Sequence, residues 1–91
     1  MPRYIIERSI PDLGQMSAQE LQAVARQSNG VLAEMPPAIQ WVHSYVTDDR
    51  LYCTYIAPSA DLILEHARRG GFPADSVMTV HTIIDPTTGE G

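Results

Sequence analysis

The sequence has few of the residues that mark secreted, nucleic-acid-binding or membrane-spanning proteins. Its one cysteine, Cys53, cannot form an internal disulfide, and a small domain without a disulfide is typical of the cytoplasm. Only six of the 91 residues are Lys or Arg against eleven Asp or Glu, which gives a net charge of -5. Nucleic acids and anionic membranes select clustered cations, so neither is an expected partner, whereas a cation is.

Long apolar runs are also absent. No stretch approaches the roughly 18 apolar residues of a membrane span, and the first residues lack the charged segment and apolar run of a secretion signal. We therefore expect a soluble, cytoplasmic protein. A chain of 91 residues forms one small domain, and such a domain often buries further apolar surface against a second copy of itself. A homodimer is the predicted assembly.

The stretch 39–57 predicts a β-hairpin. Two runs rich in Val, Ile, Thr, Tyr and Trp flank Asp48 and Asp49, as in antiparallel strands joined by a two-residue turn. Alternation then places aromatic residues and a histidine on one face, and aliphatic residues with Cys53 on the other. The cross-strand pairs expected are Thr47 with Arg50, Tyr45 with Tyr52, His43 with Thr54, and Trp41 with Ile56.

Four further elements are predicted around this hairpin. They are a strand over 3–8, a helix from 17, a helix from 59 to 70, and a strand over 76–85. The first helix either ends at Asn29-Gly30, where glycine is unfavourable, or continues to Glu34. Ser17 and Glu20 form a capping-box pattern at the first helix start, and Gly70-Gly71 ends the second helix. Residues 1–85 thus make one domain, and 86–91 a flexible tail.

This order of elements predicts an α+β, ferredoxin-like βαββαβ sandwich. Its right-handed crossovers place both helices on one face of a four-stranded antiparallel sheet. The other face stays bare and is expected to carry Trp41, Tyr45, Tyr52 and Ile56, with His43 as a further candidate. An exposed apolar surface of this kind marks a binding or dimer surface, and a second copy packed on it would enclose a cavity.

Three histidines are candidate ligands, because imidazole binds nickel, copper and zinc. His43 is expected among aromatics in mid-strand, His66 at the flank of the second helix, and His81 on the last strand, on the opposite sheet edge from His43. No pair has the spacing of a known metal motif, so a site must be assembled in three dimensions, across a dimer for His43 and His81. Structural or solvated roles are the alternatives for all three histidines. The carboxylates available to complete a site are Glu65, Asp48, Asp49 and Asp85.

Nucleophilic catalysis finds little support in the sequence. Cys53 is expected on the helix-covered face, where a cysteine is normally an inert hydrophobe. Pro2, if exposed by removal of Met1, resembles the catalytic N-terminal proline of the tautomerase superfamily, but the rest of the chain lacks that family's pattern.

Several strings resemble a family of small bacterial nickel-binding proteins that are grouped under a domain of unknown function. They are WVHSYVTDD at 41–49, YCTY at 52–55, EHARRGGFPAD at 65–75 and TIIDPTT at 82–88, and the similarity extends from RYIIER at 3–8 onward. The resemblance implies a dimeric ferredoxin-like fold that binds divalent nickel on its surface, with a role in metal sequestration or tolerance. His43 and His66 lie within the matching strings.

These observations support two hypotheses from different classes. The first is a non-enzymatic, homodimeric nickel-binding protein that uses His43 and His66, with Glu65 or a hairpin aspartate and with His81 as a further candidate. The second is a small-molecule-binding or catalytic dimeric α+β barrel, in which Trp41, Tyr45 and Tyr52 line a cavity and His43 is the acid or base.

Overall fold

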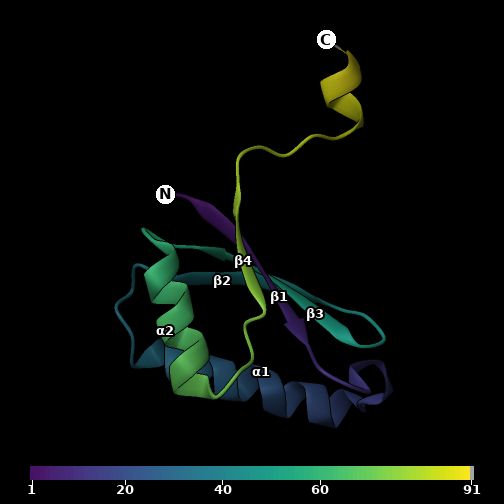
Figure 1. Cartoon of the computed structure of the whole chain (residues 1–91), viewed down its shortest axis with the longest axis vertical. Helices are drawn as coiled ribbons and strands as arrows, with labels where there is room; N and C mark the ends of the chain where they lie inside the picture. Colours follow the sequence, from purple (N-terminus) through teal and green to yellow (C-terminus); the bar gives the residue numbers. More distant parts are fainter. Residues whose placement is uncertain (91) are drawn as a thin grey trace.

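The computed structural model describes residues 1–90, which fold into a four-stranded antiparallel sheet with two long helices on one of its faces (Figure 1). The elements in chain order are β1 (Arg3–Ser9), η1 (Leu13–Gln15), α1 (Ala18–Ala33), β2 (Gln40–Val46), β3 (Arg50–Ile56), α2 (Ala60–Gly70), β4 (Ser76–Val80) and η2 (Pro86–Glu90). The strand order is β2-β3-β1-β4. The predicted α+β, ferredoxin-like arrangement is confirmed.

The helix ends are explained by local chemistry. At the start of α1 the Ser17 hydroxyl accepts the Glu20 amide at 3.1 Å, and the Glu20 carboxylate accepts the Ser17 amide at 2.9 Å, so the predicted capping box is present. α2 ends at Gly70 and is followed by Gly71, whose φ of 69° is left-handed and favours glycine. Gly70 is required for a different reason, because a Cβ there would collide with the ring of Phe72.

The turn of the hairpin is as predicted. The Thr47 amide donates to the Arg50 carbonyl at 3.0 Å, which leaves Asp48 and Asp49 as the two turn residues. The pairs of Tyr45 with Tyr52 and of His43 with Thr54 are also confirmed.

The predicted pair of Trp41 with Ile56 is wrong. A bulge between Trp41 and His43 adds one residue to β2, so Trp41 lies opposite Tyr55 instead. Because one extra residue reverses the alternation, the indole moves to the helix-covered face. There it packs against the core, and its Nε1 donates to the Ser44 hydroxyl at 3.0 Å.

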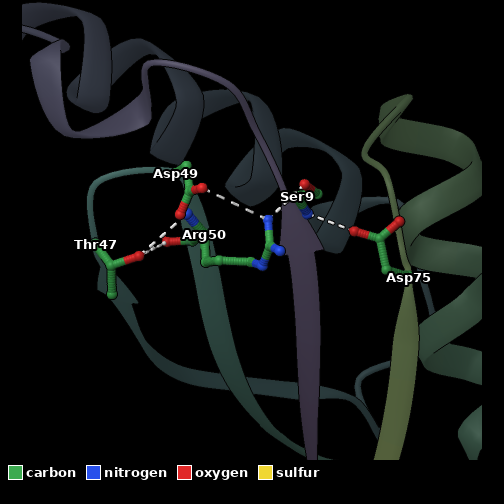
Figure 2. Close-up of polar contacts among 5 residues, drawn as sticks. All are labelled: Ser9, Thr47, Asp49, Arg50 and Asp75. Carbon is green, nitrogen blue, oxygen red and sulfur yellow. Dashed lines mark hydrogen bonds and ion pairs between the residues drawn. The ribbon is translucent and has the colours of Figure 1, made fainter.

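A polar network ties the strands together at the hairpin end of the sheet (Figure 2). Ser9, the last residue of β1, accepts a hydrogen bond from Arg50 Nη1 at 2.7 Å, and its amide donates to Asp75 Oδ2 at 2.5 Å. Asp49 adds an ion pair with Arg50 at 3.9 Å. All these groups are at the surface, where such contacts contribute little to the stability of the protein. The network mainly holds the ends of the strands in place.

The core lies between the sheet and the two helices. Its buried members are Tyr4, Ile6, Met35, Ile39, Cys53, Tyr55, Ala57 and Ile63. Cys53 is on the helix-covered face, as predicted. Among residues 1–90, no helix has the length and apolar content needed to cross a membrane.

The last strand is shorter than predicted. β4 ends at Val80 rather than at Asp85, because Val80 pairs with Arg3, the first residue of β1, and no residue of β1 remains to pair with the chain beyond Val80. Figure 1 shows the chain leaving the sheet after β4 and ending in η2. Asp85 accepts hydrogen bonds from Thr87 and Thr88 at the start of this short helix. The predicted tail, 86–91, is thus η2 as far as Glu90, and Gly91 lies outside the described residues.

Candidate functional site

The face of the sheet that the helices leave uncovered, here the helix-free face, carries the first group of candidates. A depression of about 280 Å³, the outer hollow, lies on it. The side chains that line it include Arg3, Ile5, His43, Tyr45, Val80 and Ile83. They come from β1, β2, β4 and the segment after β4, so the hollow spans the width of the sheet.

His43 is the histidine of the outer hollow. Its imidazole is exposed and makes no hydrogen bond within residues 1–90. It packs edge-on against the ring of Tyr45, with the ring centroids 4.9 Å apart and the planes at 75°. Both ring nitrogens are therefore available to an external ligand.

The aromatic surface predicted around His43 is present in part. Tyr45 is 61% exposed, and Tyr52 lies opposite it on β3, half-buried. Trp41 is absent from this face because of the bulge, so the predicted cavity lined by Trp41 together with His43, Tyr45 and Tyr52 does not form within one copy.

His66 is not at the flank of α2, where the sequence placed it. The side chain is fully buried beneath the helix, with Nε2 3.2 Å from the Ser28 hydroxyl and Nδ1 3.4 Å from the Tyr55 hydroxyl. Burial, followed by the nearby positive charge of Arg8, lowers the pKa of His66, although the hydrogen bond with Ser28 opposes the shift. The shift favours the neutral ring, and burial leaves a surface metal without access to its nitrogens in this conformation.

Arg8 extends this buried cluster and was missed by the sequence reasoning. It is 1% exposed, its Nη1 donates to the Pro73 carbonyl, and its Nη2 lies 3.5 Å from the Tyr55 hydroxyl. Burial raises the pKa of Tyr55 to about 12, so that side chain stays neutral. The signal was available, because Arg8 follows Tyr4 and Ile6 at the period of two that marks the buried face of β1.

The other predicted ligands are dispersed. The Glu65 carboxylate accepts from Arg68 at 2.7 Å and from Arg69 at 2.8 Å, and these hydrogen bonds lower the pKa of Glu65 to about 2. His81 is exposed beyond the end of β4. Within residues 1–90 no three His, Cys, Asp or Glu side chains are grouped so that they could hold a metal ion.

A second space lies on the opposite side of the sheet, between α1 and the strands. This inner cavity of about 180 Å³ is lined mainly by apolar side chains, Trp41 among them, and by Arg8. The sequence reasoning did not predict it, because it results from the distance between helix and sheet.

The sequence of residues 4–80 matches the family model described as nickel responsive protein SCO4226-like. The chain belongs to this family. The matched region contains His43, Glu65 and His66 and ends one residue before His81. No curated protein is significantly similar to the chain.

A solved structure shares the fold of this family member. The crystal structure of SCO4226 from Streptomyces coelicolor A3(2) aligns with a TM-score of 0.75 at 14% sequence identity, over 90% of this chain and 99% of that chain. The two proteins therefore share their fold.

Proposed function

We propose that this protein is a non-enzymatic, cytoplasmic nickel-binding protein that acts in metal sequestration or tolerance, with His43 as a ligand. The observation that carries the proposal is the exposed imidazole of His43 on the helix-free face, in a chain of a nickel-responsive family. Imidazole is a favourable ligand for Ni²⁺. The cytoplasm is supported by the single, buried and unpaired Cys53.

One copy of the chain offers an incomplete ligand set. Among the described residues, His43 has no grouped acidic or imidazole partners, and His66 and Glu65 are occupied by hydrogen bonds within the protein. Two copies that face each other through their helix-free faces would offer four exposed imidazoles, His43 and His81 from each. We therefore propose that nickel binds between two copies, with solvent completing its coordination.

The helix-free face supports such a homodimer. Tyr45, Met78 and Ile83 are 61%, 44% and 63% exposed, which is unfavourable for apolar side chains in water. Two copies related by a two-fold axis contact each other through the same surface. One self-complementary surface is then enough to bury the exposed apolar side chains of both copies.

Titration calorimetry with NiCl₂ tests the proposal. We expect saturable binding to the wild type and weaker binding to His43→Ala, because that variant lacks the imidazole ligand. The expected loss is at least about tenfold, which corresponds to about 1.4 kcal/mol. Glu65→Gln is the matched control and should bind as the wild type does, because Arg68 and Arg69 already hold that carboxylate. Unchanged nickel affinity in His43→Ala would contradict the assignment. Light scattering with and without nickel reports the oligomeric state.

A small-molecule or catalytic role at the outer hollow is the second candidate. Its supporting observation is the depression of about 280 Å³ beside His43, in which an acid or base could act. Trp41 would take no part in it, since that side chain lies on the other face. Tight binding of a metabolite-sized ligand that is lost in His43→Gln, in a protein that does not bind nickel, would favour this candidate.

A further inference from the structure

The inner cavity combines an apolar lining with a buried cation. Its apolar lining includes Leu13, Leu21, Val24, Trp41, Leu51 and Phe72. Arg8 also lines the cavity and carries the charge. The Arg8 side chain is one of the largest buried groups of the protein, at 1% exposed. It also stacks on Phe72, with Cζ 5.6 Å from the ring centroid.

No anion compensates Arg8 within the described residues. Its hydrogen-bond partners are the Pro73 carbonyl and the Tyr55 hydroxyl, which are both uncharged, and no carboxylate of residues 1–90 comes within 4.0 Å of it. The third member of the cluster, His66, is buried and has no negative charge whether or not it is protonated. Buried charges in proteins are normally paired with an opposite charge, whereas Arg8 has only neutral hydrogen-bond acceptors. An anion beside Arg8 would supply the missing charge.

Arg8 has the donors to bind one. A guanidinium carries five N–H groups in a planar fork that matches both oxygens of a carboxylate. The two hydrogen bonds of Arg8 use only part of this capacity.

The size of the cavity limits the rest of the ligand. An apolar protein cavity of about 150 Å³ holds one benzene molecule, so about 180 Å³ suits one aromatic ring or a short alkyl chain with a small polar group. The wall offers few polar groups, and an apolar ligand body has no hydrogen bonds with water to lose on entry.

The cavity also reaches the surface. Val46, which lines it, lies on the edge strand β2 and is 45% exposed, and Leu21 and Val24 of α1 are half-buried. A small molecule can therefore enter between α1 and β2 without passing through the sheet.

We propose that the inner cavity binds a small apolar monocarboxylate, whose carboxylate pairs with Arg8 and whose hydrocarbon part fills the space between α1 and the sheet. This site lies across the sheet from His43, so it does not depend on nickel binding there. The full chain would thus hold an organic acid inside and present its metal ligands outside.

Binding of benzoate and hexanoate to the wild-type protein tests the proposal, with benzyl alcohol and hexanol as uncharged analogues of the same shape. The readout is the shift of amide resonances in ¹H–¹⁵N spectra of metal-free protein, which also reports where the ligand binds. We expect saturable binding of at least one acid at roughly millimolar concentration or tighter, and at least about tenfold weaker binding of its alcohol. Shifts should centre on residues such as Leu21 and Leu51 that line the cavity.

Two variants distinguish the contribution of the Arg8 charge from that of the cavity volume. Arg8→Met should lose the preference for acid over alcohol, and Ala25→Leu, which fills the cavity from α1 and leaves Arg8 in place, should lose both ligands. The comparison of acid and alcohol in the wild type remains decisive even if Arg8→Met fails to fold. The proposal is overturned if neither acid saturates, if acid and alcohol bind equally well, or if the shifts map to the helix-free face.

Discussion

The Tyr55 hydroxyl lies 3.4 Å from Nδ1 of His66, and the two rings meet edge to face with their centroids 5.5 Å apart. With Ser28 on the other nitrogen, His66 is satisfied by neutral partners alone. The buried cluster therefore favours an uncharged imidazole, and this preference makes the stability of the protein sensitive to pH.

We expect the free energy of unfolding to fall as the pH is lowered from about 7.5 to about 5.5. Burial holds the pKa of His66 below its ordinary value of 6.5, so the unfolded chain takes up the proton more readily than the folded protein does. The contribution of neutral His66 to the free energy of unfolding is thus complete above about pH 6.5. It is lost below that pH, by up to about 1.4 kcal/mol per pH unit. Urea unfolding at several pH values measures it. His66→Asn should flatten the dependence, and an equally steep slope in that variant would assign the effect to other groups.

A pair of glycine substitutions tests the packing at the end of α2. Gly70→Ala places a methyl group against the Phe72 ring, which itself packs on His66, so we expect a loss of about 1 to 3 kcal/mol in the free energy of unfolding. Gly30→Ala is the matched control. It lies exposed within α1 with open space around the new Cβ, and should stabilise by about 0.5 to 1 kcal/mol. Thermal unfolding compares the two, and the same sign for both would contradict the packing argument.

The two helix starts provide another matched pair. Ser17→Ala removes the hydroxyl that accepts the Glu20 amide, so we expect a loss of about 1 kcal/mol. Ser59 occupies the same position in α2 but makes no side-chain hydrogen bond there, so Ser59→Ala should change stability by less than about 0.5 kcal/mol. The urea midpoints of both variants measure the difference. Equal losses would mean that the hydroxyl of Ser17 contributes through something other than the cap.

The sequence predicted most of the fold because local and long-range signals agreed. Alternation on either side of Asp48 and Asp49 predicted the strand pairing of the hairpin correctly as far as His43. The capping box predicted where α1 begins. The bulge before His43 could not be predicted, because a single inserted residue leaves no compositional mark where neither Pro nor Gly is involved. Trp41 was misplaced for that reason alone.

The candidate site was predicted less well, because polar residues were assumed to lie at the surface. His66 follows Ile63 by three residues and precedes Gly70 by four, and all three are buried on the same face of α2. Its helical spacing therefore indicated burial, while its residue type suggested exposure. The inner cavity depends on how far α1 stands from the sheet, a quantity that no local pattern encodes.

The bulge at Val42 also affects how copies of this molecule meet at high concentration. β2 is an outer strand of the sheet, and its free backbone groups would otherwise form a regular row on which a strand of another molecule could add. The extra residue breaks that row and twists it out of line. Growth of continuous sheets into fibrils is thereby disfavoured at this edge of the sheet.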